Sequence, residues 1–132
     1  MKALVCAFPD YRCTPFRADF SFENQIRRSD PALVHKSLSR WFIVEVELVS
    51  HSLMGHVMPQ VCCFRYGDPL SSTAQILCDA IPEMDYACAI SFLQFIPRSV
   101  VVVANRSNPG WSACFRGAGR SDAHRLCVPK QA

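Results

Sequence analysis

The chain has 132 residues, of which 50% are hydrophobic and 19% are charged, a composition that excludes a globally disordered protein. Its formal net charge of +3 at pH 7 permits an anionic partner, but a strongly basic nucleic-acid-binding protein would carry more. A chain of this length buries one hydrophobic core, so we expect a single domain over residues 1–132.

The sequence of the first 38 residues indicates little regular secondary structure. Residues 1–29 contain Pro9, Pro15 and scattered phenylalanines and predict an irregular N-terminal region, in which "FSFENQI" is a short strand or an edge segment. Asp30 suits the cap of a short helix or turn that begins at Pro31. We expect that helix or turn within "DPALVHKSL".

The clearest strand is "RWFIVEVELV", which is rich in β-branched and aromatic residues. Successive side chains of a strand alternate between its two faces. One face carries Trp41, Ile43, Glu45 and Glu47, and the other carries Phe42, Val44, Val46 and Leu48. Because the second set is wholly apolar, we interpret it as the core face.

The next stretch, "HSLMGHVMPQVCCFRYG", has apolar residues at helical spacing, although Gly55 and Pro59 interrupt it and Pro59 could instead open the helix. "DPLSSTAQILCDAI" and "MDYACAISFLQFI" predict two further helices, and "RSVVVVANR" predicts a strand buried on both faces. Residues 106–132 are expected to be loop-rich, with "HRLCV" as a candidate last strand.

This order of elements predicts an α/β fold, with α+β as the alternative. We expect a small mixed or parallel sheet flanked by helices, in which the crossover from strand 41–49 to strand 99–104 is right-handed if the two are parallel neighbours. The apolar N-terminal run is shorter than a secretory signal, and Glu45, Glu47, Arg98 and Asn105 interrupt the longest apolar stretches. We therefore expect a soluble, cytoplasmic protein without a membrane partner.

The eight cysteines include no C-x-x-C pair, which removes the usual anchor of a zinc ribbon or a thioredoxin-type site. Cys62, Cys63, Cys78 and Cys88 lie in apolar stretches, where an unmodified cysteine behaves as a small hydrophobic residue. We expect mainly buried free thiols; disulfide bonds and a cysteine metal site are the alternatives.

Two acids on one face of the strand indicate a cation site. Glu45 and Glu47 point to the same side, roughly 7 Å apart by the strand rise. Like-charged carboxylates in a half-buried position raise each other's pKa, and a divalent cation between them removes that cost. Mg²⁺ is held by one or two carboxylates together with substrate phosphates, so we expect Mg²⁺ or Mn²⁺ here.

Asp30 with Pro31, the "EVE" strand and Gln60 on the following helix resemble the PD-(D/E)xK nuclease superfamily. The resemblance covers residues 30–66 and extends loosely to Asn105. It implies a restriction-endonuclease-like core over residues 30–105, a metal ion held by Asp30 and Glu45, and Gln60 as the helix residue that orients the catalytic site. Glu47 is then either a third metal ligand or a general base. The implied function is a metal-dependent nuclease that acts on or binds nucleic-acid phosphodiesters.

The sequence departs from the family at Glu47, where the superfamily has a lysine. A carboxylate cannot stabilise the developing charge on phosphorus as an ammonium group does. Lys36, Arg40 or Arg65 could supply the missing cation. The alternative is a catalytically inactive nuclease-like fold that serves as a protein-interaction or regulatory module, so enzymatic activity stays open.

Basic and aromatic residues gather in the last third of the chain, where Arg98, Arg106, Arg116, Arg120 and Arg125 flank Trp111 and Phe115. Arginine and aromatic side chains stack on nucleotides. We expect nucleic-acid contacts from Lys36, Arg40, Arg65, Arg106 and Trp111, although the same mixture is ordinary in a loop-rich tail. Equally, Glu45 and Glu47 could lie on the solvent face of an edge strand, Gln60 on a helix surface, and Asp30 could be only a cap.

His51 and His56 form an alternative site for a transition metal. A spacing of five residues places two side chains poorly for a shared ion on one regular helix, so we favour the carboxylates. Motifs for serine hydrolases, P-loop enzymes, dinucleotide-binding folds and zincins are absent from the sequence.

Overall fold

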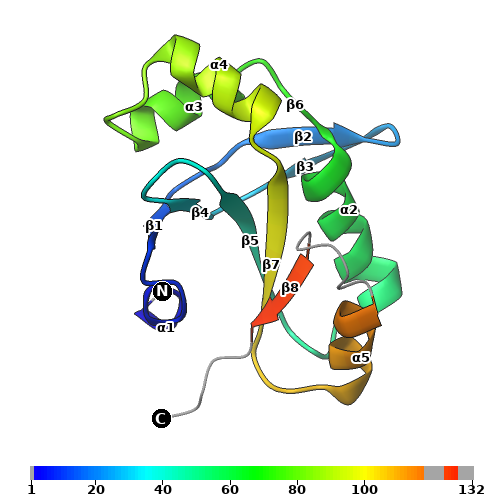
Figure 1. Ribbon diagram of the computed structural model, residues 1–132. Helices are drawn as coiled ribbons and strands as arrows, with labels where there is room; N and C mark the ends of the chain where they lie inside the picture. The colour runs from blue at the N-terminus through cyan, green and yellow to red at the C-terminus, as the bar shows by residue number, and fades with distance from the viewer. Residues whose placement is uncertain (1, 118–123, 128–132) are drawn as a thin grey trace.

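The computed structural model of the chain describes residues 2–117 and 124–127 and is a mixed α/β fold (Figure 1). Within these residues a central sheet has five strands in the order β1-β4-β5-β7-β8. Its strands are β1 (Tyr11–Thr14), β4 (Ala32–His35), β5 (Trp41–Glu47), β7 (Arg98–Ala104) and β8 (His124–Cys127). The predicted α/β class is therefore confirmed.

The pairing of strands in the central sheet changes from antiparallel to parallel at β5. β1, β4 and β5 are antiparallel neighbours, whereas β5, β7 and β8 run parallel. Trp41 lies opposite Arg98 at one end of the β5–β7 pair, and Glu47 lies opposite Ala104 at the other. The expected mixed sheet is therefore present, and β5 and β7 are parallel neighbours within it.

A second, antiparallel sheet has the order β3-β2-β6 among the described residues. β2 (Asp19–Phe22) and β3 (Gln25–Arg28) form a hairpin, and β6 (Asp68–Pro69) pairs with β2. Glu23 and Asn24, at the tip of the hairpin, both have positive φ, at 48° and 62°. That left-handed pair is the geometry of the two-residue turns that match the twist of a hairpin.

The helices are α1 (Lys2–Ala7), the π-helical turn η1 (Leu53–Val57), α2 (Met58–Tyr66), α3 (Thr73–Ala80), α4 (Tyr86–Phe95) and α5 (Pro109–Gly117). Pro59 lies in the first turn of α2, where its missing N–H leaves no helical hydrogen bond unmade. The reading in which Pro59 opens a helix is confirmed, as are the helices expected around α3 and α4.

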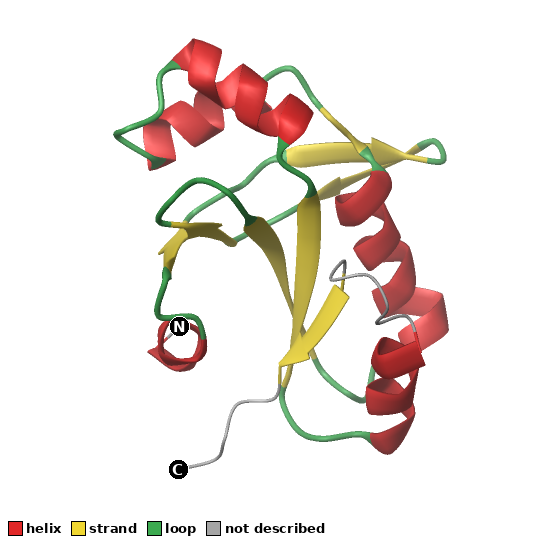
Figure 2. Cartoon of the chain, in the orientation of Figure 1, coloured by secondary structure: helices red, strands yellow, loops and turns green. Residues whose placement is uncertain are grey.

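The two faces of the central sheet are covered unequally. Figure 2 shows α2 and α5 on one side of the sheet and α1 on the other. The larger core lies on the first side and includes Trp41, Ile43, Phe64 and Trp111. A smaller core lies on the second side, where Leu4 packs with Leu33, Phe42, Val44 and Val101.

The expected core face of β5 is wrong at the end of the strand. Phe42 and Val44 are buried, but Val46 and Leu48 are exposed, whereas Glu47 on the opposite face is only 4% exposed. The smaller core ends before Val46, while η1 and α2 cover the face that carries Glu47. A carboxylate is therefore buried where an alternating pattern predicts an exposed one.

Three other expectations for the chain require correction. Residues 1–29 are not irregular: they form α1, β1 and the β2–β3 hairpin, and β1 pairs with β4. The segment after Asp30 is the strand β4 instead of a helix or turn, because its apolar residues enter the sheet between β1 and β5. The region 106–132 contains α5, although the candidate strand at "HRLCV" is confirmed as β8.

Every cysteine whose side chain the structure describes is a free thiol, as expected. Cys63 is buried, and its thiol donates to the carbonyl oxygen of Phe20 at 3.4 Å. Cys62, Cys78 and Cys88 are partly exposed, so the expectation of full burial is wrong for these three. No helix in the described part of the chain has both the length and the apolar content needed to cross a membrane.

Candidate metal centre

The candidate site lies where the parallel strands β5 and β7 end, at the edge of the sheet where ligands bind in many α/β folds. Glu47 is the last residue of β5, and its side chain is 3% exposed. The loops that follow the two strands are tied together: the backbone N–H of Val49 donates to Oδ1 of Asn105 at 2.9 Å. This link holds the segment after Glu47 in place.

A turn brings His51 back to the carboxylate. The backbone N–H of His51 donates to the carbonyl oxygen of Leu48 at 3.0 Å, which closes the turn after β5. His51 Nδ1 then lies 2.7 Å from Oε2 of Glu47. Ser52 caps the following helical turn, since its hydroxyl accepts from the N–H of Gly55 at 3.0 Å.

The π-helical turn η1 and the start of α2 supply two more side chains. His56 Nε2 lies 3.4 Å from Oε1 of Glu47, and the amide nitrogen of Gln60 donates to the same oxygen at 3.2 Å. The rings of His51 and His56 meet edge to face with their centroids 4.7 Å apart. Single π-helical turns are found preferentially at functional sites, because the extra residue re-aims a side chain.

The hydrogen bonds assign the ring protons in this network. An ionised carboxylate only accepts, so Nδ1 of His51 carries a proton and Nε2 of the neutral ring keeps its lone pair. The amide nitrogen of Gln60 also donates to Nε2 of His56 at 3.0 Å, so that nitrogen is unprotonated. In this pattern each ring needs only one proton, and the neutral imidazole is the form that binds metal ions; a metal ion bound at Nδ1 of His51 would release the proton there.

Glu47, His51 and His56 offer ligand atoms that all lie within 4.8 Å of one another. Metal–nitrogen and metal–oxygen bonds of about 2.1 Å place neighbouring ligand atoms of a tetrahedral site about 3.4 Å apart. The contact of 3.4 Å between Glu47 and His56 already has this length. Two imidazoles with one carboxylate suit zinc and other transition metals better than Mg²⁺, which prefers oxygen ligands.

Glu45 lies beside this cluster and has a perturbed pKa. Burial, the charge of Glu47 and a hydrogen bond with Glu47 together raise the pKa of Glu45 to about 8, although Arg27 acts in the opposite direction. The carboxyl group of Glu45 is therefore mainly protonated at neutral pH, which makes it a poor cation ligand.

The structure does not bring the predicted ligand set together. Of the described side chains, the one group of three or more candidate ligands within 4.8 Å is Glu47, His51 and His56, so Asp30, Glu45 and Glu47 do not form such a group. Asp30 accepts from the backbone N–H of Phe16 at 3.2 Å and faces Nε of Arg17 at 3.9 Å. Gln60 does contact the site, through Glu47.

The cations proposed to replace the family's lysine are far from Glu47 or otherwise engaged. Lys36 and Arg40 lie in the turn before β5, and Glu47 ends this seven-residue strand, about 20 Å away by the strand rise. The guanidinium of Arg65 lies over the ring of Tyr66, 5.1 Å from its centroid. Lys36 and Arg40 therefore do not reach Glu47, and a role for Arg65 stays a prediction.

Only some of the residues proposed to contact nucleic acid are exposed in the structure. Trp111 is 4% exposed and packs in the larger core with Phe115, so neither ring is available for stacking on a base. Arg98 donates to the carbonyl oxygens of Phe64, Arg65 and Gly67, which end α2. Arg106 remains exposed in the loop after β7. The side chains of Arg116, Arg120 and Arg125 lie outside the described residues.

Sequence reasoning gave too little weight to His51 and His56 because it placed them on one regular helix. His51 lies in the turn that precedes η1, and η1 is π-helical, so the helical spacing rule does not apply to this pair. A usable signal was the Glu-x-x-x-His pattern of Glu47 and His51 immediately after a strand. Comparison of the chain with protein-family models, with curated proteins and with solved structures gives no match.

Proposed function

We propose that the protein is a metal-dependent hydrolase in which Glu47, His51 and His56 hold a divalent transition-metal ion, and that nucleic-acid phosphodiesters are its substrates. The observation that carries this proposal is the buried carboxylate of Glu47 in contact with both imidazoles, at 2.7 and 3.4 Å. A buried anion flanked by two neutral imidazoles is a ready ligand set for a cation.

The surroundings of the cluster suit hydrolysis. The side chains of His51 and His56 are 43% and 48% exposed, so water and a substrate reach the same face. A bound ion with three protein ligands activates water and neutralises charge on a phosphate oxygen, which is the task of the lysine that the chain lacks. Gln60 holds Glu47 in position through its amide, as outer-sphere partners of metal ligands do.

The second candidate is a non-enzymatic protein in which the same network is structural and the nuclease-like scaffold serves as an interaction module. One observation favours it: Glu47, His51, His56 and Gln60 satisfy one another without an ion. Such a network would fasten the end of β5 to η1 and α2. The two candidates differ in metal binding and in turnover, so one set of measurements separates them.

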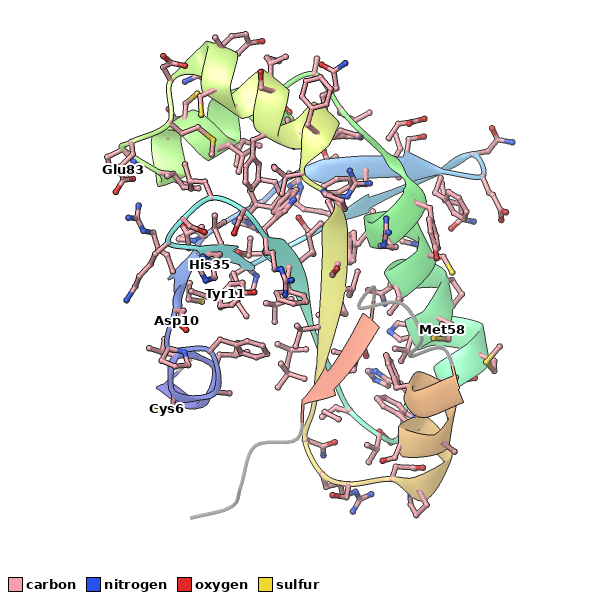
Figure 3. All side chains as sticks on the ribbon, viewed as in Figure 1. Cys6, Asp10, Tyr11, His35, Met58 and Glu83 are labelled. Carbon is pink, nitrogen blue, oxygen red and sulfur yellow. The ribbon has the colours of Figure 1, made fainter. Side chains whose placement is uncertain are left out.

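The test is hydrolysis of bis(p-nitrophenyl) phosphate and of a single-stranded oligonucleotide by protein stripped with EDTA and reloaded with Zn²⁺ or Mn²⁺. We expect activity only after reloading, no activity in His56→Gln, and a loss of about 10- to 100-fold in Gln60→Ala. His35→Gln is the matched control, because Figure 3 shows His35 on the opposite side of the molecule from Met58, where α2 begins.

Activity that persists in EDTA, or that falls equally in His56→Gln and His35→Gln, would contradict the proposal. Absence of both metal binding and turnover would favour the structural candidate. Stoichiometric metal binding without turnover of either substrate would support the metal centre and contradict the proposed hydrolysis.

A further inference from the structure

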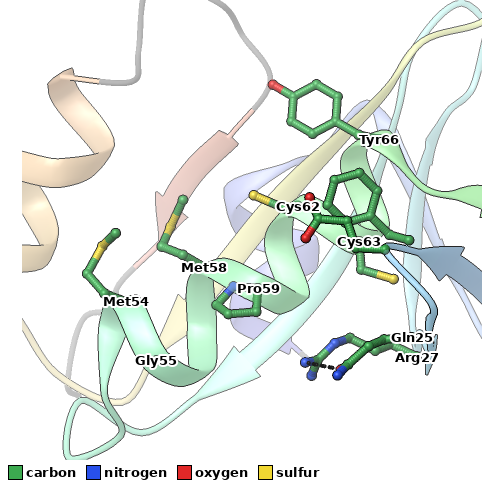
Figure 4. Close-up of a pocket in the computed structure, with 11 residues that line it drawn as sticks. Gln25, Arg27, Met54, Gly55, Met58, Pro59, Cys62, Cys63 and Tyr66 are labelled. Atoms are coloured by element: carbon green, nitrogen blue, oxygen red, sulfur yellow. Dashed lines mark hydrogen bonds between the residues drawn. The ribbon is translucent and has the colours of Figure 1, made fainter.

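A pocket of about 710 Å³ opens between the β2–β3 hairpin and the face of η1 and α2 that points away from the core (Figure 4). Sites for small molecules usually have volumes of about 300 to 1,000 Å³. The hairpin contributes Phe22, Glu23 and Arg27, and the helices contribute Met54, Met58 and Tyr66. The pocket is thus large enough for one small organic ligand.

The hairpin side of the pocket is largely polar, whereas the helix side carries the methionines Met54 and Met58. Met54 is 70% exposed, and Met58 lies one helical turn further on the same side of the helix. Figure 4 shows both thioethers on that side of the helix, and Tyr66 at the far end of α2. Methionine side chains adapt their shape to a ligand, and aromatic rings bind flat groups by stacking. A flat, apolar ligand group therefore fits the helix side of the pocket.

One cation lies in the pocket. The guanidinium of Arg27 donates to Oε1 of Gln25 at 3.1 Å, and among the described residues no carboxylate forms an ion pair with it. Its neighbour Arg28, in contrast, is paired with Asp19 at 2.9 Å. Glu23, the acid of the pocket, lies at the tip of the hairpin, away from the part of β3 where Arg27 pairs with Phe20.

The pocket also borders the candidate metal centre. Gly55 and Pro59 line it, and they are next in the chain to His56 and Gln60, which both contact Glu47. Phe20, the partner residue of Arg27, accepts the thiol hydrogen of Cys63 on α2, so β3 and α2 meet along this pocket. A ligand held by Arg27 in this pocket would therefore lie against η1 and α2, the helical segments that carry His56 and Gln60.

We infer that this pocket binds the substrate as a nucleotide unit, with its phosphate on Arg27 and its base against Met54, Met58 and Tyr66. The inference rests on the proposed phosphodiester hydrolysis and names the substrate group that the site recognises. The positive charge of Arg27 favours a phosphate group, and the side chains of Met54, Met58 and Tyr66 favour an aromatic base over a sugar alone. Arg27 is then a specificity-determining residue that holds substrate beside the metal centre.

The experiment measures the binding of adenosine 5′-monophosphate by isothermal titration calorimetry to protein kept in EDTA, so that no metal contributes. We expect adenosine and ribose 5-phosphate to bind at least about tenfold more weakly than the nucleotide, since each lacks one of the two recognised groups. Arg27→Gln should weaken nucleotide binding by about tenfold or more and leave adenosine binding unchanged. Arg28→Gln, next to it in β3, is the matched control.

Equal weakening by Arg27→Gln and Arg28→Gln would overturn the inference, because it would show attraction to general positive charge. Nucleotide binding no tighter than that of adenosine would overturn it as well. Neither result would change the metal titration expected for the wild type and for His56→Gln, so the proposed metal centre is tested separately. Conversely, nucleotide binding that depends on Arg27 in a protein that binds no metal would support the pocket and contradict the proposed hydrolase.

Discussion

We expect a transition-metal ion to raise the melting temperature of the wild-type protein and His56→Gln to abolish that rise. His56 is the most suitable position for the perturbation, because its side chain is 48% exposed and glutamine there should cost little stability in EDTA. The substitution removes an imidazole ligand from the group of Glu47, His51 and His56 while the fold stays intact.

The size of the effect follows from mass action. An ion that binds only the folded state adds about 2.7 kcal/mol to the free energy of unfolding when its concentration is 100 times Kd. Unfolding entropy near 60 °C is about 2.1 cal/mol/K per residue, which for 132 residues is about 0.28 kcal/mol/K. The ratio of these two quantities predicts a rise of about 10 °C in the wild type.

The assay is thermal unfolding of EDTA-stripped protein, followed by circular dichroism at increasing Zn²⁺ or Mn²⁺. His51→Gln and Glu47→Gln should also lose the rise. Glu45→Gln and Asp30→Asn should keep it, because neither side chain belongs to the cluster. An equal rise in wild type and His56→Gln would refute the site. A rise lost in Glu45→Gln and Asp30→Asn but kept in His56→Gln would restore the carboxylate site that the sequence predicted.

Two further predictions concern stability. Trp111→Ala should lower the free energy of unfolding in urea by about 3 to 5 kcal/mol, since the ring is buried in the larger core; a change under 1 kcal/mol would contradict that placement. Hydrogen bonds from Arg12 lower the pKa of Glu83 to about 2, so the pair's small contribution is present above the carboxyl's ordinary value of 4.5 and is lost as the pH falls toward 2. Urea titrations from pH 6 to 3 should show a shallower acid decline for Arg12→Gln, and curves parallel to wild type would argue against the pair.

Local sequence patterns were sufficient for the elements whose signals are strongest. The apolar, β-branched runs around Ile43 and Val101 identified β5 and β7, and the uninterrupted valines of β7 indicated a strand buried on both faces. Helical spacing identified α3 and α4. The order of these elements was enough for the α/β class and for a mixed or parallel sheet, because a strand that returns after helices usually lies parallel to the first. The tertiary structure decided that β5 and β7 are direct neighbours.

Contacts between distant segments decided the N-terminal half of the fold. β1 is four residues long and pairs with β4 about twenty residues later, and β2 pairs with β6 almost fifty residues later. Strands this short have no local preference strong enough to be recognised, and their stability comes from the partner strand. The burial of Trp111 was likewise decided by distant contacts, because its place in the larger core depends on where α5 packs.

The candidate site was likewise predicted in part by local sequence patterns and decided in part by contacts between distant segments. The sequence by itself determined that Glu47 would lie on a strand and that Gln60 would follow near the start of a helix, because alternation and helical spacing are local properties. The strand was expected to run to residue 49, whereas β5 ends at Glu47. Only the tertiary structure decided which face of β5 is buried, and so which acid meets His51 and His56. The turn after Leu48, the π-helical turn η1 and the link from Asn105 to Val49 aim these imidazoles at one carboxylate. Such convergence depends on backbone turns that no periodic pattern encodes.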